Sequence, residues 1–367
     1  MHVYLIGICG TGMGSLATLL VDAGHRVTGS DPSPRPPMSD VLAAKGIRVL
    51  QGWDPTNVDD ARPDLVVVGN VCRADNPEAS RAADAGLDRV SMPGAIRALL
   101  VPERKPLVVA GTHGKTTTAS LLGVILWRAG LDPTILVGGV ALDLNGSSRL
   151  GKGEHLVIEG DEYDSAFFEK VPKFWSYEPH AAVIGSVQHD HLDIYPDEAS
   201  YIAAFEGLAD RMAPSGLLAV WAGDPLAVAI ARRARCRVIR YALDEDDLDS
   251  GPSDAGLDYS ARLRWSRGCG ARGELRVRWP DGSATAIRTP LAGEHNARNT
   301  LAALVLAREV CGLGPEEIGS GLESFRGVAL RQQHMGTRRS IRVYRDFAHH
   351  PEAVAETLRA MRPVAAP

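Results

Sequence analysis

The segment GTHGKTTT, from Gly111 to Thr118, constrains the fold of this chain more than any other part of its sequence. It follows an apolar run typical of a strand, LVVA, and precedes a long helical run, SLLGVILWRAG. A glycine turn between a strand and a helix directs backbone N–H groups at a phosphate group, with the helix N-terminus behind them. We therefore expect a nucleotide-binding α/β unit, with Lys115 at the β- and γ-phosphates and the Thr116 hydroxyl on Mg²⁺.

The spacing of this loop differs from the usual pattern GxxxxGK[ST], because Val109 stands five residues before Gly114, where that pattern has its first glycine. We interpret the segment as a variant phosphate loop. The alternative is a chance glycine turn with a surface lysine, and the flanking strand and helix argue against it. The residues predicted to bind the nucleotide here are Gly111, Thr112, His113, Gly114, Lys115, Thr116 and Thr117.

A second glycine cluster lies near the N-terminus, at Gly7, Gly10, Gly12 and Gly14, before the helical run SLATLLVDAG. The next strand, HRVTGSD, ends at Asp31, at a plausible distance for a contact to a ribose. The glycines follow the order GxxGxG rather than GxGxxG, so the pattern indicates a nicotinamide site only weakly. A Rossmann-like turn that holds another diphosphate fits better, and glycines that serve packing alone are the remaining alternative.

Acidic and imidazole side chains gather after two further predicted strands. EGDEYDS, residues 159–165, follows the apolar run HLVI, and QHDHLD, residues 188–193, lies further along the chain. Ligand sites of α/β sheets gather at the carboxyl ends of strands, and oxygen and imidazole ligands there suit Mg²⁺ or Mn²⁺. Zinc is the competing assignment, but no cysteine is near in the sequence and a phosphate loop is present. Each cluster alone is more typical of a solvated turn, so the prediction depends on their combination with Lys115 and Thr116.

The alternation of strands and helices predicts a mixed α/β protein of two or three domains, since 367 residues exceed the usual size of one. A Rossmann-like domain is expected at 1–100, VPERKP (101–106) as a linker, and a central nucleotide-binding domain at 106–328 with a glycine turn at Gly138 and Gly139. RLRWS and ELRVRWP are expected to form a β-hairpin at the edge of the central domain. Residues 329–367, one strand and one helix, are expected to begin a third Rossmann-like domain that is incomplete, because so few elements cannot bury a core.

The charge and apolar composition exclude several classes of partner. Lys and Arg number 40 against 45 Asp and Glu, a net charge of −5, so no global positive field draws nucleic acid or anionic lipid to the chain. The sequence has no run of about 18 apolar residues and no signal peptide, and its five cysteines include no CxxC pair. We expect a cytoplasmic protein with reduced thiols and with neither nucleic acid nor a membrane as partner.

Several motifs of the chain occur in the order found in the Mur ligases: GICGTGM, GSD, GTHGKTTT, EGDEYD, HDHLD, GEHNARNTLAA and DFAHHP. The chain resembles that family over essentially its whole length. The family consists of ATP-dependent enzymes that form amide bonds of peptidoglycan, so the resemblance implies an enzyme that uses ATP and Mg²⁺. It also implies three domains, one each for a UDP-sugar, for ATP and for the incoming amine.

Within the family, GNVCRADNPE, GGV and DEYDSAFFEKVPKFWSYEP look most like the branch that joins UDP-N-acetylmuramate to the tripeptide L-alanyl-γ-D-glutamyl-meso-diaminopimelate in peptidoglycan recycling. A related branch, which adds L-alanine, typically has serine where Tyr163 stands. The implied mechanism begins with transfer of a phosphoryl group to the lactyl carboxylate, after which the amine attacks the acyl phosphate and expels phosphate. The expected substrates are therefore UDP-N-acetylmuramate and a murein peptide.

Position by position, the resemblance implies roles for residues of this sequence. Lys115, Glu159 and His191 match catalytic residues, and Thr116, Glu159 and His191 match metal ligands. The other nucleotide-contacting positions are His295, Asn296, Asn299, Arg331, Asp346 and His349. The substrate-contacting positions are Gly10, Thr11, Gly12 and Met13 at the diphosphate turn, and Ser30, Asp31 and Asn70 on the uridine side.

Two departures from the family pattern bear on these roles. Other branches carry a carbamylated lysine beyond the matched histidine, where this chain reads YIAAFEG, so Glu206 is either a substitute carboxylate or a solvated helix residue. The family's paired arginines are reduced to Arg331 in ALRQQ. Besides a ligase, the alternatives are a UDP-sugar and ATP-binding protein without turnover, and a nicotinamide-dependent oxidoreductase.

Overall fold

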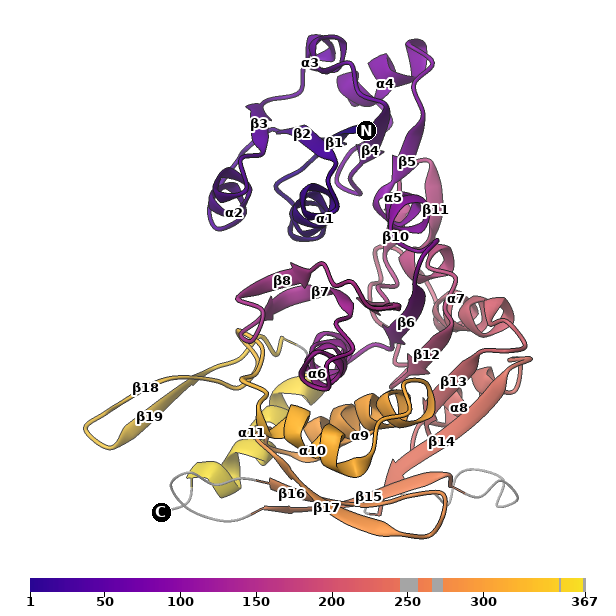
Figure 1. The fold of residues 1–367 in the computed structure, drawn as a ribbon, viewed down its shortest axis with the longest axis vertical. Coiled ribbons are helices and arrows are strands. Elements are labelled where there is room, and N and C mark those ends of the chain that lie inside the picture. The colour runs from indigo at the N-terminus through magenta and orange to yellow at the C-terminus, as the bar shows by residue number, and fades with distance from the viewer. Residues whose placement is uncertain (245–256, 266–272, 350, 366–367) are drawn as a thin grey trace.

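The computed structural model describes residues 1–244, 257–265, 273–349 and 351–365. It confirms the predicted α/β class, with an N-terminal layered unit at the top of Figure 1 and a larger central unit below it. Residues 266–272, which join the two strands of the predicted hairpin, lie outside the described ranges. Within those ranges, no helix combines the length and the apolar character that crossing a membrane requires.

The first sheet is fully parallel, with the strand order β3-β2-β1-β4-β5. Its strands are β1 (His2–Ile6), β2 (Arg26–Asp31), β3 (Arg48–Gln51), β4 (Leu65–Val68) and β5 (Arg89–Ser91). Its helices are α1 (Thr11–Asp22), α2 (Met38–Ala44), α3 (Pro55–Ala61), α4 (Pro77–Asp84) and α5 (Met92–Leu99). The strand order reverses between β1 and β4, where sheets of this kind bind ligands at the carboxyl ends of their strands. The turn after β1 and Asn70 after β4 lie at that end.

The second sheet has ten strands in the order β17-β16-β15-β14-β13-β12-β6-β9-β7-β8. Its strands are β6 (Lys105–Ala110), β7 (Thr134–Ala141), β8 (Gly146–Arg149), β9 (His155–Glu159), β12 (Ala181–Ile184), β13 (Leu217–Trp221), β14 (Arg237–Leu243), β15 (Tyr259–Trp265), β16 (Gly273–Arg278) and β17 (Ala284–Thr289). The strands from β7 to β15 pair in parallel, and β8, β16 and β17 pair antiparallel at the two edges. The predicted pairing of RLRWS with ELRVRWP is confirmed, because Leu263 lies opposite Leu275.

The remaining elements of the central unit surround this sheet (Figure 1). They are α6 (Lys115–Arg128), β10 (Asp164–Ala166), β11 (Glu169–Pro172), the 3₁₀ helix η1 (Lys173–Ser176), α7 (Glu198–Arg211), α8 (Pro225–Ala231), α9 (Glu294–Glu309) and α10 (Pro315–Glu323). Nearly every residue of α6 is buried, as in a helix covered on all sides. Because α6 begins directly after the loop that follows β6, its burial fixes Lys115 and Thr116 at the carboxyl end of that strand.

Two local predictions are wrong. Gly138 and Gly139 lie inside β7 rather than in a turn. The central sheet begins at Lys105, so the predicted linker 101–106 ends in a strand that pairs with β9, where Lys105 lies opposite His155. Pro106 is the second residue of this strand, close to its start, where the missing backbone N–H of proline disturbs the sheet least.

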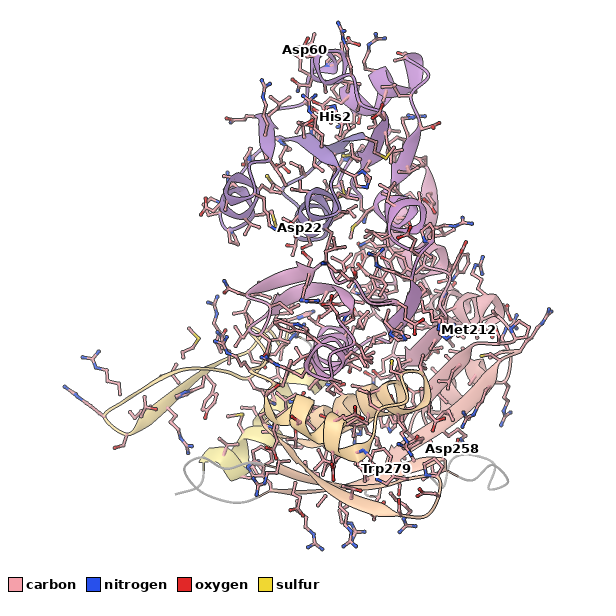
Figure 2. All side chains as sticks on the ribbon, viewed as in Figure 1. His2, Asp22, Asp60, Met212, Asp258 and Trp279 are labelled. Carbon is pink, nitrogen blue, oxygen red and sulfur yellow. The ribbon has the colours of Figure 1, made fainter. Side chains whose placement is uncertain are left out.

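The C-terminal residues form an antiparallel hairpin, β18 (Gln333–Arg338) and β19 (Ile341–Arg345), followed by α11 (Pro351–Ala365). The hairpin extends away from the central unit in Figure 1, and Figure 2 shows its side chains pointing into open space. Ile341 is 67% exposed and Met335 is 54% exposed. In contrast, α11 packs on the central unit, where Ala360 and Val364 lie in a small apolar cluster with Ala292.

The two sheets share a hydrophobic core. One continuous cluster of buried side chains runs from Val3 and Leu5 in β1 to Val108 and Ala110 in β6. A second cluster lies on the opposite face of the central sheet and includes most of α6 and α9. The boundaries predicted at residues 100, 106 and 328 stay a prediction, since a shared core does not mark where one domain ends.

Candidate active site

The loop between β6 and α6 has a backbone that only glycine suits at two positions. Gly111 has a φ of 131° and Gly114 a φ of 79°, in the region that side chains disfavour. A Cβ atom on Gly111 would lie 3.0 Å from the backbone nitrogen of Gly185, and one on Gly114 would lie 2.1 Å from the side-chain oxygen of Asn299. The loop is therefore pressed between the end of β12 and the start of α9.

Side chains after β12 hold this loop in place. The Thr112 hydroxyl accepts a hydrogen bond from the backbone N–H of Gln188 at 2.9 Å and lies 2.8 Å from the hydroxyl of Tyr201. His113 pairs through Nε2 with the side-chain oxygen of Gln188 at 3.0 Å. Thr117 is buried in the first turn of α6. These contacts fix the shape of the predicted phosphate-binding loop.

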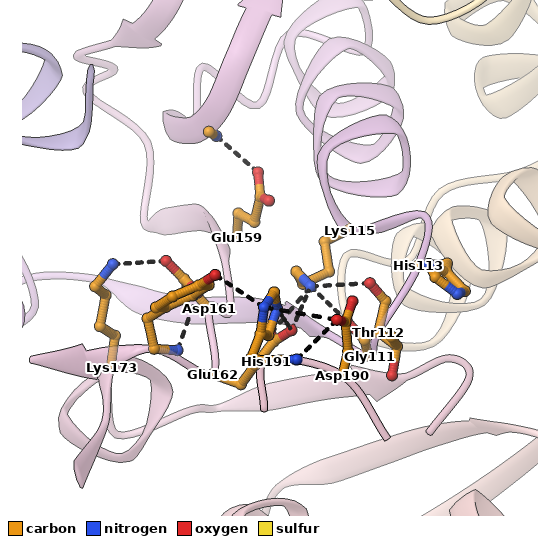
Figure 3. Close-up of polar contacts among 12 residues, drawn as sticks. Gly111, Thr112, His113, Lys115, Glu159, Asp161, Glu162, Lys173, Asp190 and His191 are labelled. Carbon is orange, nitrogen blue, oxygen red and sulfur yellow. Dashed lines mark hydrogen bonds and ion pairs between the residues drawn. The ribbon is translucent and has the colours of Figure 1, made fainter. Parts of the chain in front are cut away.

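Lys115 lies at the centre of the polar contacts drawn in Figure 3. Its ammonium group donates to the carbonyl oxygens of Gly111 and Thr112 at 2.8 and 3.1 Å, and it forms an ion pair with Glu162 at 3.0 Å. Burial pulls the pKa of Lys115 down, but the negative charges of Glu162 and Glu159 outweigh that effect and the pKa is raised. The lysine is therefore held as a cation at the base of the loop.

Thr116 and Glu159 lie together beside this lysine. The Thr116 hydroxyl donates to Glu159 Oε1 at 3.0 Å, and the backbone N–H of Gly138 donates to Glu159 Oε2 at 2.7 Å. Burial raises the pKa of Glu159 more than the Lys115 charge lowers it, so this carboxylate would gain from a further cation. Hydroxyl and carboxylate oxygens are the ligands that Mg²⁺ prefers, so these two residues fit a magnesium ion bound together with phosphate oxygens.

His191 has both ring nitrogens engaged by other residues. Its Nε2 lies 3.0 Å from Glu162 Oε1, and its Nδ1 lies 2.8 Å from the hydroxyl of Tyr163. The hydrogen bond to Glu162 raises the pKa of His191, against the effect of burial. The structure thus brings Thr116 and Glu159 together but directs His191 to Glu162. Among the residues that it describes, no three His, Cys, Asp or Glu side chains are grouped to hold a metal.

Glu162 belongs to the predicted acidic cluster, but sequence reasoning gave it no role of its own. Its side chain has no exposed surface, it pairs with Lys115 and His191, and its carboxylate lies 3.4 Å from the hydroxyl of Tyr201. The Tyr195 hydroxyl donates to the Glu162 backbone oxygen at 2.5 Å. The acidic run after β9 signalled a site, but the sequence alone did not separate Glu162 from its neighbours.

The start of α9 contacts the loop through an asparagine pair. Asn296 donates to the carbonyl oxygen of Ala292 at 2.8 Å, and Asn299 donates to the Asn296 side-chain oxygen at 3.3 Å while its own oxygen faces Gly114. His295 points the other way, with Nδ1 3.3 Å from Glu356 on α11. The structure therefore places Asn299 next to the predicted nucleotide and His295 between α9 and α11.

Arg331, Asp346 and His349 lie where the chain enters and leaves the β18–β19 hairpin. The Arg331 guanidinium lies 5.2 Å from the centre of the Phe347 ring. Asp346 accepts hydrogen bonds from the backbone N–H groups of Gln332 and Ala348 at 2.7 and 2.8 Å. His349 is exposed, and its Nδ1 lies 3.1 Å from the Phe347 oxygen. These contacts hold together the two chain segments that flank the hairpin. A role of Arg331, Asp346 and His349 in nucleotide binding stays a prediction.

In the N-terminal sheet, the predicted substrate residues differ in exposure. Gly10 and Thr11 are exposed at the N-terminus of α1, whereas Met13 is buried and Gly12 packs against Met92. Ser30 is buried and donates its hydroxyl to Glu78. The Asp31 carboxylate accepts from the backbone N–H of Cys9 at 3.1 Å and from that of Ser33 at 2.9 Å. Asp31 therefore orders the turn after β1.

A pocket of about 600 Å³ lies between Asn70 of the N-terminal unit and residues of the central unit. Asn70 after β4 contributes one wall, and Tyr163, Lys170 and Asp193 contribute to the wall from the central unit. Because Tyr163 also contacts His191, the pocket adjoins the cluster around Lys115.

Glu206, the other candidate carboxylate, lies on α7, with its carboxylate 3.8 Å from Arg233.

The fold and site are those of a class of α/β proteins in which a glycine loop between a strand and a helix, typical of nucleotide binding, lies near a pocket between two units. Models of known families identify it further. Residues 2–103 match the Mur ligase family, catalytic domain, and residues 109–307 match the Mur ligase middle domain. The chain belongs to the Mur ligase family, whose members are ATP-dependent ligases.

Individual relatives carry two different names at similar identity. UDP-N-acetylmuramate–L-alanyl-γ-D-glutamyl-meso-2,6-diaminoheptandioate ligase of Escherichia coli is 34% identical over 99% of this chain and 76% of its own length. UDP-N-acetylmuramate–L-alanine ligase of Arthrobacter is 36% identical over 99% of this chain and 73% of its own length. The crystal structure of a murein peptide ligase from Psychrobacter arcticus is 32% identical, with a TM-score of 0.82, over 100% of this chain and 77% of that one. Membership of the family favours a ligase over the oxidoreductase alternative.

Proposed function

We propose that this protein joins UDP-N-acetylmuramate to the tripeptide L-alanyl-γ-D-glutamyl-meso-diaminopimelate at the expense of ATP. The observation that carries the proposal is the position of the Lys115 loop beside a pocket lined by Asn70 and Tyr163. A phosphate donor in the loop and a sugar carboxylate in the pocket would then meet between the two sheets. Residues 1–100 are proposed to bind the UDP-sugar, 106–328 ATP, and 329–367 to begin the domain for the amine.

The proposed reaction follows from the charges around Lys115. A free carboxylate resists attack by an amine, so its oxygen first attacks the γ-phosphorus of ATP, forming an acyl phosphate and releasing ADP. The amine nitrogen then attacks the acyl carbon, phosphate leaves, and the nitrogen loses a proton. Lys115 neutralises the phosphate oxygens during this transfer. Thr116 and Glu159 would hold Mg²⁺, which when bound offsets the negative charge of the phosphates.

The amine is the finer part of this proposal. The segment DEYD at 161–164 supports the tripeptide, whereas the relatives named for L-alanine, at similar identity, support L-alanine as the second candidate. Asn299 and Gly114 do not line the pocket that contains Asn70 and Tyr163. They therefore support binding of ATP equally, whether the amine is the tripeptide or L-alanine.

The test is ADP release by the chain with UDP-N-acetylmuramate, ATP and Mg²⁺, with tripeptide or L-alanine as the amine. Tripeptide-dependent release that is lost in Lys115→Ala and retained in Lys152→Ala, an exposed lysine, is the expected result. ADP release with L-alanine but not with the tripeptide would show that L-alanine is the amine substrate. Binding of UDP-N-acetylmuramate without ADP release with either amine would indicate a binding protein instead.

A further inference from the structure

The imidazole of His191 is held from two sides. Glu162 lies at Nε2 and the Tyr163 hydroxyl at Nδ1, at 3.0 and 2.8 Å. The same Glu162 oxygen lies 3.0 Å from the Lys115 ammonium group, so Nε2 faces the phosphate loop and Nδ1 faces away from it (Figure 3). The ring therefore has a defined direction relative to the predicted nucleotide.

We propose that Tyr163 is a positioning residue that aims Nε2 of His191 at the metal and nucleotide end of the site. This inference rests on the proposed function and on the metal role that the family resemblance implies for His191. A histidine that binds a metal through one nitrogen is normally held through the other by a neighbouring group, which fixes the tautomer and the ring direction. Tyr163 occupies that place for His191.

The backbone of His191 is held in place, so only the direction of its side-chain ring is left to be fixed. His191 has a φ of 58°, a left-handed conformation, and its N–H donates to the Asp190 carboxylate at 2.7 Å. Its carbonyl oxygen accepts from the backbone N–H of Tyr195 at 2.9 Å. Since the main chain is fixed from both sides, the two ring nitrogens decide where the imidazole points.

Tyr163 is itself fixed. Its backbone N–H donates to the Asp161 carboxylate at 3.1 Å, and Asp161 pairs with Lys173 at 2.6 Å. The Tyr163 and His191 rings pack with centroids 4.3 Å apart at 51°. Removal of the phenol oxygen alone would thus leave the ring in place and delete only the contact to Nδ1.

A phenol hydroxyl suits both states of this histidine. In the structure Nε2 faces the Glu162 carboxylate, which favours a proton on Nε2; in the neutral ring Nδ1 then accepts from Tyr163. If Nε2 held a metal ion, that proton would be lost, and Nδ1 would carry one and donate it to the Tyr163 oxygen. The hydroxyl accepts or donates without moving, whereas phenylalanine does neither.

The test uses Mn²⁺ as a probe that binds in place of Mg²⁺, added to the full chain with a non-hydrolysable ATP analogue. Free Mn²⁺ is measured by electron paramagnetic resonance for the wild-type chain, Tyr163→Phe and His191→Ala. We expect Tyr163→Phe to weaken Mn²⁺ binding by roughly ten- to a hundredfold, the usual effect of removing such a supporting group. Tyr259→Phe, which removes a phenol that donates to Glu309 far from this site, should leave the affinity unchanged.

A second measurement does not depend on metal. In ¹⁵N-histidine-labelled protein the wild-type His191 should show one fixed tautomer, and Tyr163→Phe should shift its ring nitrogens toward the averaged values of a free imidazole. Weaker Mn²⁺ binding in His191→Ala, with unchanged binding and unchanged nitrogen shifts in Tyr163→Phe, would overturn the positioning role alone. Unchanged Mn²⁺ binding in His191→Ala would overturn the metal role of His191 and this inference with it, while the ADP-release assay still decides the ligase activity.

Discussion

The Lys115 ammonium group lies 3.0 Å from the carboxylate of Glu162, and the Glu162 side chain has no exposed surface. Phosphate oxygens of a bound nucleotide would seek the same ammonium group. The ion pair therefore keeps the lysine charged and in place before the nucleotide arrives, and it must weaken when the nucleotide binds.

Replacing Glu162 with glutamine tests this exchange. Loss of one partner of a buried ion pair leaves the other charge uncompensated, so Glu162→Gln should lower the free energy of unfolding by about 3 kcal/mol. Because the competing carboxylate is gone, ATP should raise the melting temperature of this variant by more than it raises that of the wild-type chain. Urea and thermal unfolding measure both effects. Glu103→Gln, at an exposed carboxylate, is the control, and an equal loss in both variants would contradict the prediction.

Gly114 should tolerate no side chain. Alanine there would have a φ of 79° and would press on Asn299, so Gly114→Ala should cost about 2 kcal/mol of stability and weaken nucleotide binding. Combining it with Asn299→Ala removes the clash but not the backbone strain. The double variant should therefore lose less stability than the two single variants added together, which a double-mutant cycle by urea denaturation measures. Strict additivity would show that the two residues do not touch.

Alanine substitutions at two glycines of α10 should change the stability of the protein in opposite directions. A Cβ on Gly319 would meet only Ile287, at 3.7 Å, so Gly319→Ala should stabilise the protein by about 0.4–1 kcal/mol through the unfolded chain. A Cβ on Gly321 would lie 2.8 Å from the Ile125 Cα atom of α6, so Gly321→Ala should destabilise it by about 1–3 kcal/mol. Each variant is the other's control in chemical denaturation. Destabilisation by both would mean that α10 lies closer to β17 than described.

Glu356 should make the attachment of α11 depend on pH. The hydrogen bond from His295 lowers the pKa of Glu356 more than burial raises it, to below its ordinary value of 4.5. The carboxylate therefore contributes stability above that value, and the contribution is lost as the pH falls through the lower pKa of the folded state. Hydrogen exchange of α11, corrected for intrinsic rates, should show protection falling as the pH drops from about 5 toward 3.

Glu356→Gln should already exchange faster at the upper end of that range and should change less with pH. Glu316→Gln, at an exposed carboxylate of α10, should follow the wild-type curve. Protection of α11 that does not change with pH in the wild-type chain would contradict the role of this ion pair.

Sequence reasoning found the parts of the site that depend on local chain geometry. The Lys115 loop could be predicted because glycines, lysine and threonine must be adjacent between a strand and a helix. Glu159 could be predicted because it ends a strand that turned out to be the neighbour of β6. In both cases the physical requirement acts over a few residues.

Other features depended on contacts between distant segments and escaped prediction. Glu162 pairs with Lys115 and His191, 47 and 29 residues away, and nothing in DEYD distinguishes it from Asp161 or Asp164. Gly138 was assigned to a turn from its residue type, but it lies in an extended strand where its N–H donates to Glu159. A glycine that allows close approach and a glycine that allows a turn have the same letter in the sequence.

The first turns of α9 have two neighbours at once. Asn299 touches the phosphate-binding loop at Gly114, and His295, one helical turn earlier, pairs with Glu356 of α11. Because one helix contacts both the loop and α11, a shift of α9 would alter both contacts together. Suppose that a ligand tightens the packing of α11 on α9 and thereby changes the affinity of the loop for a nucleotide by some factor. By thermodynamic reciprocity, the nucleotide must then change the affinity for that ligand by the same factor. Under that condition, filling of the loop would change how tightly α11 packs on α9.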